Sequence, residues 1–398
     1  MTILCYAMSG TALAAALALC AAAAQAASAT DFNDAPPNVE HFSPAFEGQT
    51  RAPVITDDTP IKATAAVTGL QNPWGMAELP YGSWLVTERG GSLRMVGADG
   101  SLSDPIAGVP KVASAGQGGL LDVQIAPDFA SSRRLWLSFS EPVEGGNHTA
   151  VATATLAADG RALEDVTVIF RQTPTYDGDK HFGSRIIPDG QGGIFVTLGE
   201  RSDVPIRDTA QADDNTLGKI VHIDGTTGAP APGNPGMGLP EIYAKGVRNV
   251  QAGTLDASGQ LWTIEHGPEG GDELNRIEPG KNYGWPVISY GQSYGGAPLN
   301  EGISAKEGME QPVYYWDPVI APSGMAFYDG AMFPDWKGSI LVGGMVAQAL
   351  VRLTMEGGKV TGEARYPQDE RVRDVAVASD GSVRLLLDSG EMRVLTRE

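Results

Sequence analysis

The side chain in this sequence best suited to moving a proton is the imidazole of His181, in the polar segment 177–185. Apolar residues follow it, so we expect His181 at the end of a loop that leads into a strand. A neutral imidazole can accept a proton from a hydroxyl group, because its unperturbed pKa lies close to neutral pH. On position alone, a histidine that caps the loop or lies at the surface is the more common outcome.

A second segment, 265–275, concentrates oxygen atoms that can bind a hard metal ion. It contains carboxylates, an asparagine, and glycine and proline residues that leave backbone carbonyl groups free, and a further polar turn follows at 280–286. Such ligands suit calcium better than zinc, and His266 has no partner at the spacing of zinc ligands. The segment does not match an EF-hand, and a plain acidic turn remains open as the alternative.

Cationic and amide side chains form a third group. Arg248 and Asn249 are adjacent, and Arg371 and Arg373 are separated by one residue. Alternation along a strand places the last two guanidinium groups on one face, which suits a ligand with several carboxylates. Gln117 lies between glycines that let a ligand approach the backbone closely, and no phosphate-loop lysine follows it. Surface ion pairs and an ordinary glycine-rich turn are the alternatives.

The elements that must position these side chains follow a repeated pattern. Each copy has two apolar, strand-forming runs joined by a tight turn, which predicts a β-hairpin. The six copies begin at Trp74, Leu121, Ser184, Gln251, Gly324 and Val372. Such hairpins bury their apolar faces only against each other, so we predict an all-β fold, a six-bladed β-propeller over residues 61–398, rather than a pair of packed sheets. The longest insertions lie between the third and fifth copies, where we expect the chemistry.

Composition agrees with this fold class and excludes some partners. The 398 residues include 51 glycines and 27 prolines but only 19% charged residues, which favours short strands and tight turns. The formal net charge of -20 argues against nucleic acid, because binding to phosphates draws on lysine and arginine. A neutral small molecule or a cation is a better match for this negative charge.

The N-terminal segment 1–28 is apolar and rich in alanine, which is typical of a secretory signal peptide, although no lysine or arginine precedes Arg51. Both cysteines, Cys5 and Cys20, lie inside it, so we expect no disulfide in the mature protein. Residues 29–60 are polar and rich in proline, and they predict an extended or mobile N-terminal arm. No later stretch is long and apolar enough to span a membrane, so we expect a soluble periplasmic or secreted protein.

Ordered motifs along the chain resemble those of a known family. They are Asn72-Pro-Trp-Gly, Gly116-Gln-Gly-Gly, His181-Phe-Gly-Ser, Leu217-Gly-Lys-Ile, Gly246-Val-Arg-Asn, Glu265-His-Gly-Pro, Asn282-Tyr-Gly-Trp-Pro, Pro322-Ser-Gly-Met and Arg371-Val-Arg-Asp. In this order they resemble the soluble glucose and aldose sugar dehydrogenases that use pyrroloquinoline quinone (PQQ). The resemblance extends from about residue 60 to the C-terminus, and its specificity comes from the number of motifs in order.

The resemblance implies a reaction and a set of catalytic residues. His181 resembles the general base that removes the proton from the anomeric hydroxyl of an aldose, while hydride moves from the sugar carbon to the quinone and a lactone forms. Glu200 matches an acidic position that orients the site, and Arg248 resembles a group beside the reacting atoms. The substrate is then a small aldose and the electron acceptor is unidentified, with a monomer or a homodimer expected.

The same resemblance implies two cofactors, PQQ and calcium. The residues that resemble PQQ-binding positions are Gln117, Arg248, Asn249, Tyr294, Arg371 and Arg373. The carbonyl groups of Gly267 and Pro268 resemble the ligands of a calcium ion that polarises the quinone, and Glu273 with Tyr283 resembles a second, structural calcium site.

One departure from the family pattern weakens the expectation of PQQ binding. The family commonly has a cofactor-binding lysine where this chain has Val346, so a charge-assisted contact is missing unless Lys180 or another cation replaces it. Two other functions therefore stay open: a propeller lactonase that uses calcium to activate water, and a non-catalytic propeller that binds a ligand.

Overall fold

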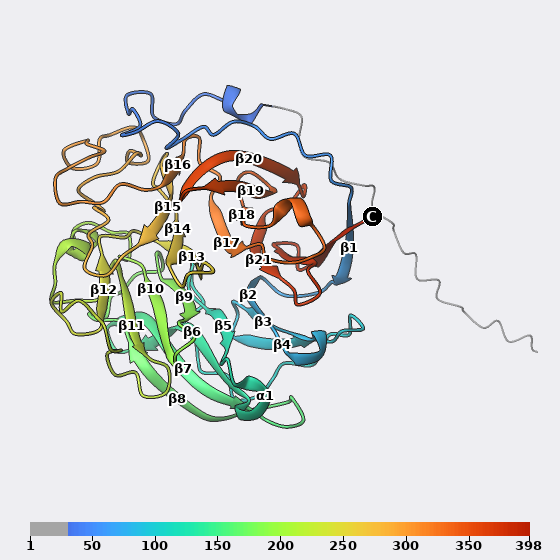
Figure 1. Cartoon of the computed structure of the whole chain (residues 1–398). Coiled ribbons are helices and arrows are strands. Elements are labelled where there is room, and N and C mark those ends of the chain that lie inside the picture. Colours follow the sequence, from blue (N-terminus) through green and yellow to red (C-terminus); the bar gives the residue numbers. More distant parts are fainter. Residues whose placement is uncertain (1–30) are drawn as a thin grey trace, which may run out of the picture.

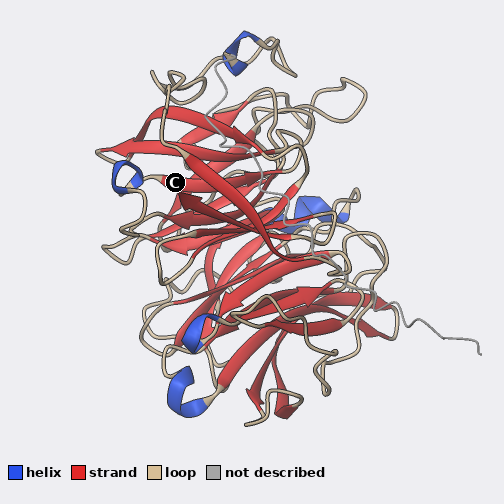
Figure 2. Cartoon of the chain, turned by 90° about the vertical axis from the view of Figure 1, so that its right-hand side faces the viewer, coloured by secondary structure: helices blue, strands red, loops and turns tan. Residues whose placement is uncertain are grey.

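The computed structural model describes residues 31–398, which form a ring of six β-sheets around a central axis (Figure 1). Figure 2 shows the ring from the side as a body of strands with a few short helices at its edges. The predicted six-bladed β-propeller is therefore confirmed, and all six predicted hairpins form the two inner strands of a blade.

Four strands make up each blade except the first, which has three. In order from the axis outward, the first three blades are β2 (Pro73–Glu78), β3 (Trp84–Glu88), β4 (Ser92–Val96); β5 (Leu120–Ile125), β6 (Arg134–Val143), β7 (Gly146–Leu156), β8 (Leu163–Arg171); and β9 (Gly183–Pro188), β10 (Gly193–Leu198), β11 (Lys219–Asp224), β12 (Ile242–Lys245). The others are β13 (Val250–Leu255), β14 (Leu261–Glu265), β15 (Asp272–Ile277), β16 (Tyr314–Trp316); β17 (Pro322–Phe327), β18 (Ile340–Gly344), β19 (Ala349–Glu356), β20 (Lys359–Pro367); and β21 (Val372–Val377), β22 (Val383–Leu387), β23 (Met392–Arg397) with β1 (Ile61–Val67).

The ring closes because the sixth blade takes its outer strand from the other end of the chain. β1 pairs antiparallel with β23, in a register that sets Ile61 opposite Arg397 and Ala63 opposite Leu395. In Figure 1 the blue strand β1 accordingly lies beside the red C-terminal strands. The repeat in the sequence does not reveal this exchange, since residues 61–67 precede the first copy of the pattern.

The described part of the N-terminal arm, residues 31–60, is extended and lies against the ring (Figure 1). The side chain of Asp57 accepts hydrogen bonds from Arg352 Nη2 at 2.8 Å and from Trp336 Nε1 at 2.9 Å. Gln49 is fully buried, and its carbonyl group accepts a hydrogen bond from the fourth blade. These contacts anchor the arm to the fourth and fifth blades. The predicted signal peptide, 1–28, lies outside the described residues.

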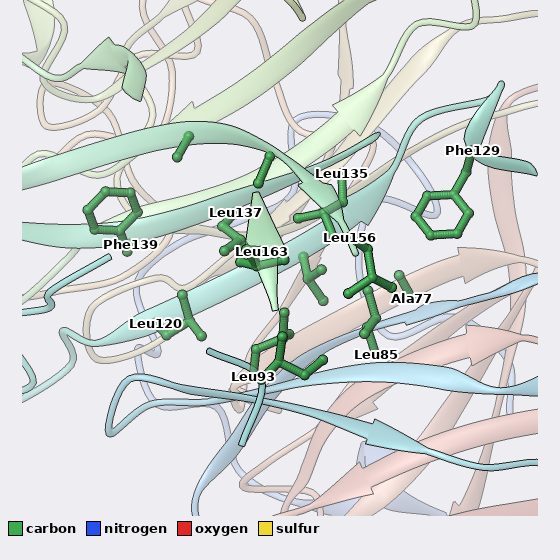
Figure 3. Close-up of a cluster of buried hydrophobic side chains, with 14 of the residues drawn as sticks. Ala77, Leu85, Leu93, Leu120, Phe129, Leu135, Leu137, Phe139, Leu156 and Leu163 are labelled. Carbon is green, nitrogen blue, oxygen red and sulfur yellow. The ribbon is translucent and has the colours of Figure 1, made fainter. Parts of the chain in front are cut away.

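Neighbouring blades bury their faces against each other. Figure 3 shows one such cluster, in which Ala77, Leu85 and Leu93 of the first blade meet Leu120, Leu135, Leu137, Phe139, Leu156 and Leu163 of the second. Each of these side chains is buried. Burying one large apolar side chain contributes roughly 1.5–3 kcal/mol, so blade contacts supply most of the stability of the ring.

The helices are too short to form a layer of their own. They are α1 (Phe129–Ser132) and the 3₁₀ turns η1 (Phe32–Asp34), η2 (Pro80–Gly82), η3 (Ile206–Gln211) and η4 (Pro334–Trp336). Within residues 31–398, no helix combines the length and the apolar character that crossing a bilayer requires.

The innermost strands surround a channel that a buried ion triad divides. Arg185 of β9 donates from Nη1 to Asp122 Oδ1 at 3.1 Å and from Nη2 to Asp374 Oδ1 at 2.9 Å. Gly75 and Gly324 make room for these two carboxylates, because a Cβ at either position would collide with them. On one side of the triad lies a cavity of about 460 Å³, lined by the later residues of all six innermost strands. The other side holds the candidate site described below.

Each innermost strand also has a register irregularity close to the triad. Such bulges bend a strand and change the direction of the side chains that follow.

We predict that Arg185→Met destabilises the fold, by about 3–5 kcal/mol at pH 8, because it leaves two buried carboxylates without their cation. Burial already raises the pKa of Asp122 to about 6 and also raises that of Asp374, against the lowering effect of Arg185. Without Arg185 the pKa values of both carboxyl groups rise further above those in the unfolded chain. The free energy of unfolding therefore falls as the pH rises from about 4. The loss should therefore be smaller at pH 5.

Urea unfolding at the two pH values measures this effect. Arg161→Met, at an exposed position of the second blade, serves as the matched control. A stability of Arg185→Met equal to that of the control at pH 8 would show that the triad contributes nothing.

Candidate active site

A polar cavity of about 180 Å³ opens at the start of the innermost strands. Residues from all six blades line it: Trp74, Arg89, Gln117, Leu121, Phe182, Gly183, Asn249, Gln251, His266, Met345, Arg371 and Arg373. They come from the first residues of innermost strands, from the loops that enter these strands and from the loops that follow the second strands, which in a propeller meet at one end of the channel. Five predicted site residues, namely Gln117, Asn249, Arg371, Arg373 and, in the adjoining loop, His181, thus come from different parts of the chain to one place.

His181 and Glu200 form a buried pair beside this cavity. The Nδ1 atom of His181 lies 3.0 and 3.1 Å from the two carboxylate oxygens of Glu200. The backbone N–H of His181 donates to Gln117 Oε1 at 2.8 Å. Among residues 31–398 the Nε2 atom of His181 has no hydrogen-bond partner. The imidazole is therefore held at one nitrogen and free at the other.

The surroundings set the charge state of the pair. Burial lowers the pKa of His181, and the positive charge of Arg248 lowers it further, against the raising effect of Glu200. Burial would raise the pKa of Glu200, but the hydrogen bonds and charges around it lower the pKa below its ordinary value. Glu200 is thus ionised near neutral pH and His181 is neutral, with a proton on Nδ1 and a lone pair on Nε2.

The backbone that presents His181 is strained. His181 has φ 48° and Ser184 has φ 90°, both in a region that side chains rarely adopt. Gly199 allows this conformation, since a Cβ there would collide with the carbonyl oxygen of His181. Strained residues of this kind concentrate at functional sites, where the surrounding structure holds them in place.

Arg201 holds the loop that ends in His181. Its guanidinium group is fully buried and donates to Asn147 Oδ1 at 2.7 Å, to Gly178 O at 2.6 Å and to Lys180 O at 3.0 Å. It also stacks on the ring of Phe182, with 4.1 Å between the guanidinium carbon and the ring centre. Nothing in the sequence pattern singles out Arg201, because its partners are loop carbonyl groups and an amide side chain more than 50 residues away in the sequence.

Arg248 connects the His–Glu pair to the predicted metal segment. Its guanidinium lies 5.2 Å from the ring centre of Trp285, whose Nε1 donates to Glu200 Oε1 at 3.1 Å. Its Nη1 donates to the carbonyl oxygen of His266 at 3.0 Å, and its backbone N–H donates to Glu265 Oε2 at 2.5 Å. The Nε–H of Arg248 is buried without a partner in the described chain.

In the two amide side chains of the site, Gln117 and Asn249, the oxygen atom already accepts a hydrogen bond and the nitrogen atom is free to donate. Gln117 Oε1 accepts from His181, and Asn249 Oδ1 accepts from the backbone N–H of Gly183 at 3.2 Å and from Gln251 Nε2 at 3.1 Å. Their side-chain nitrogens have no partner in the range 31–398. Both amides therefore offer N–H donors to a ligand with carbonyl oxygens.

Arg371 and Arg373 lie on one face, as predicted, and share one carboxylate. Asp388 accepts from Arg371 Nε at 2.9 Å and from Arg373 Nε at 2.9 Å. Tyr294 does not line the cavity: its side chain is 77% exposed, in a glycine-rich turn that carries it into solvent. Val346, at the position of the expected lysine, is 57% exposed and follows the cavity residue Met345.

Two carboxylates face each other in the predicted metal segment. Glu265 and Glu273 are directly opposite on β14 and β15, and both line a small cavity with Arg248, Gly267 and Tyr283. Burial raises the pKa of Glu265 to about 7, and burial with the charge of Glu265 raises that of Glu273 well above its ordinary value. Like charges opposite each other on adjacent strands destabilise a sheet, so this pair favours a cation.

Backbone carbonyls complete the oxygen atoms at this place. Asp272 accepts from the backbone N–H of Gly267 at 2.9 Å and fixes the turn. The carbonyl groups of Gly267 and Pro268 accept no hydrogen bond from the described chain. The hydroxyl of Tyr283 is engaged elsewhere, since it donates to Arg276 O at 2.7 Å. In residues 31–398 no three His, Cys, Asp or Glu side chains form a metal-binding group, so an ion here would depend on carbonyls.

The fold and the site together define an all-β propeller with a buried His–Glu pair and a cationic cavity at one mouth of its channel. The family model of Glucose / Sorbosone dehydrogenase matches residues 70–396. The chain is 42% identical over 335 residues to aldose sugar dehydrogenase YliI of Escherichia coli K12, covering 81% of this chain and 89% of that protein. The chain therefore belongs to the Glucose / Sorbosone dehydrogenase family, as the motifs indicated.

Solved structures agree with this assignment. The apo-form of the soluble aldose sugar dehydrogenase from Escherichia coli superposes with a TM-score of 0.81 at 39% identity, covering 85% of this chain and 100% of that one. The PQQ-bound form of an aldose sugar dehydrogenase from Streptomyces coelicolor gives a TM-score of 0.70 at 28% identity, covering 85% and 99%.

We predict that Glu200→Gln lowers the pKa of His181 further below its ordinary value, because it removes the charge that favours the imidazolium form. An NMR titration of the imidazole resonances in the protein without cofactor measures this. The chain has five histidines, so His181→Gln assigns the resonance, and His148 and His222 are internal references. An unchanged or raised pKa would contradict the pairing.

Proposed function

We propose that the protein oxidises aldoses to lactones, with PQQ as the electron acceptor and calcium as a bound ion. The observation that carries the proposal is the neutral His181, held at Nδ1 by Glu200 and free at Nε2, beside a cationic cavity to which all six blades contribute. The family of the chain and the PQQ-bound form of a Streptomyces coelicolor relative support it.

The cavity fits PQQ by its chemistry. Arg371 and Arg373 suit carboxylates, and the free amide donors of Gln117 and Asn249 suit quinone or sugar oxygens. The indole of Trp74 supplies a flat apolar wall of the cavity. The guanidinium carbon of Arg185 lies 4.2 Å from the centre of the Trp74 ring. When bound, PQQ supplies a quinone that accepts a hydride, that is, two electrons and one proton.

The residues of this chain then have distinct roles. His181 Nε2 takes the proton of the anomeric hydroxyl as the C–H bond breaks, which leaves the carbon as the carbonyl of a lactone. The Glu200 carboxylate holds the imidazole in the required tautomer and stabilises its charged form. Arg248 adds a fixed positive charge beside the oxygens that gain negative charge in this step.

The oxygen atoms of the metal segment fit calcium. The free carbonyl groups of Gly267 and Pro268 are hard ligands for a calcium ion that would supply Lewis-acid polarisation of an oxygen in the neighbouring cavity. Glu273 and Tyr283, which line a small cavity with Glu265, would hold a second, structural calcium ion that balances the two facing carboxylates. Tyr283 contributes through its backbone, because its hydroxyl is already bound.

The cellular setting follows from the N-terminal segment. We propose that residues 1–28 direct export, so that the enzyme acts in the periplasm or outside the cell on a small aldose. The electron acceptor that reoxidises PQQ is unidentified.

Titration of the purified apo-protein with PQQ and calcium tests the function, with dye reduction followed over a panel of aldoses. We expect saturable reduction that needs both additions. Lactone hydrolysis without PQQ would instead indicate a lactonase, and the absence of PQQ binding would indicate a non-catalytic propeller.

We predict that His181→Ala lowers kcat by about 10²–10⁴ while the Kd for PQQ stays unchanged, because the imidazole moves a proton and holds no carboxylate. His41→Ala, at an exposed position on the arm, is the control with normal turnover. Near-normal kcat in His181→Ala would show that the base is wrongly assigned.

We predict that calcium raises the thermal midpoint of the wild type more at pH 8 than at pH 6. Without the ion, the raised pKa values of both carboxyl groups make the fold lose stability as the pH rises from 4.5, through about 7 for Glu265 and beyond its ordinary range for Glu273. A bound calcium ion takes the place of these protons. At a free calcium concentration of 100 times its Kd, it adds about 2.7 kcal/mol to the free energy of unfolding.

Glu273→Gln should abolish most of this calcium effect and leave the apo-protein at least as stable at pH 8. Glu278→Gln, at a half-exposed position of the same blade whose only ion pair within residues 31–398 is with the exposed Arg276, should behave as the wild type. A calcium effect of full size in Glu273→Gln would place the ion elsewhere.

A further inference from the structure

Arg89 is a cation of the cavity that neither the motifs nor the reaction has given a role. It follows β3 in the first blade and lines the cavity with Arg371 and Arg373. Its backbone is fixed on both sides: its N–H donates to Asn72 O at 3.1 Å, and its carbonyl accepts from the N–H of Leu120 at 3.2 Å. The side chain of Arg89 therefore starts from a rigid point beside the channel mouth.

The charges at this place do not balance. Arg371 and Arg373 both pair with Asp388, whereas Arg89 forms no ion pair with any residue in the range 31–398. Three guanidinium charges against one carboxylate leave a net charge of +2. Burial lowers the pKa of Arg89 and the charge of Arg373 lowers it further, with a raising effect from Asp388. This cationic cluster lies in a chain whose net charge is -20.

A structural role accounts for only part of the side chain. Arg89 Nη1 donates to the carbonyl oxygen of Gly116 at 2.8 Å, which steadies the loop that carries Gln117. A guanidinium group has five N–H donors, so four remain for another partner. Arg371 likewise has a weak partner, since its Nη2 faces the sulfur of Met345 at 3.3 Å.

We propose that Arg89 is a third carboxylate-binding residue of the cofactor pocket, acting with Arg371 and Arg373 on one planar polycarboxylate. The assignment rests on the proposed function, in which this ligand is PQQ with its three carboxyl groups. A ligand carboxylate would replace the protein carboxylate that Arg89 lacks. The first blade thus supplies a cation, whereas the loop after β18 presents the neutral Val346.

Equilibrium binding of PQQ without sugar tests the assignment, followed by quenching of tryptophan fluorescence in the calcium-loaded protein. Arg89→Met should raise the Kd for PQQ by about tenfold or more, because a charge-assisted bond is lost. Arg89→Lys should raise it less, since the charge remains without the planar fork. Arg161→Met, exposed in the second blade, should bind as the wild type does.

A second readout separates binding from a merely structural role. The thermal midpoint of Arg89→Met without PQQ should stay close to that of the wild type, because the loss of the hydrogen bond to Gly116 and the relief of repulsion among three cations act in opposite directions. The dependence of log Kd on log salt should also become less steep. If Arg89→Met fails to fold, the Kd of Arg89→Lys for PQQ provides the test.

The outcomes distinguish this assignment from the proposed function. Wild-type protein that binds PQQ, with both Arg89 variants within about twofold of it, overturns the role of Arg89 and keeps the function. Wild-type protein that binds no PQQ overturns both. A raised Kd in the Arg89 variants with unchanged midpoints supports the assignment.

Discussion

Closure of the ring is the constraint on which the rest of this structure depends. No blade buries its two faces alone, so each one is stable only between its neighbours. The last contact is made by β1 and β23, strands from opposite ends of the described chain. Because the cavity takes residues from all six blades, the site exists only when this antiparallel pair has formed. Stability and function therefore share one requirement, and local damage to the sixth blade acts on both.

Charged groups around the channel fall into two kinds: those whose charge is neutralised by a partner, and those left with an excess of one sign. Arg185 between Asp122 and Asp374 has its donors and acceptors paired, which marks it as part of the fold. The arginines of the cavity exceed their carboxylates, and within residues 31–398 the facing carboxyl groups of Glu265 and Glu273 form no ion pair, although Arg248 lines the same small cavity. Burying unpaired charge costs several kcal/mol, so excesses of opposite sign in adjacent places favour an anionic and a cationic ligand together.

The fold could be predicted because short local sequence patterns encode its hairpins, whereas much of the site depends on contacts between distant parts of the chain. Six hairpins with alternating apolar residues and tight turns are enough to count blades. The closing strand was missed because pairing across more than 300 residues leaves no local pattern. Arg201 and Trp285 were missed for a similar reason: they act on backbone atoms and on Glu200 from other loops. Tyr294, expected at the cofactor, lies in an exposed turn, because loop conformation depends on contacts that spacing does not encode.

The strain at His181 shows how the scaffold serves the chemistry. A left-handed backbone costs of order 1–3 kcal/mol, and it persists here because Gly199 leaves the needed space and Arg201 donates to oxygens of Asn147, Gly178 and Lys180. In return, Nδ1 faces Glu200 and Nε2 is left free, so the tautomer is decided before a substrate arrives. A relaxed loop would let the imidazole rotate and would expose it to water, which would raise the pKa of His181 toward its ordinary value. The strained loop therefore keeps the imidazole of His181 neutral near neutral pH.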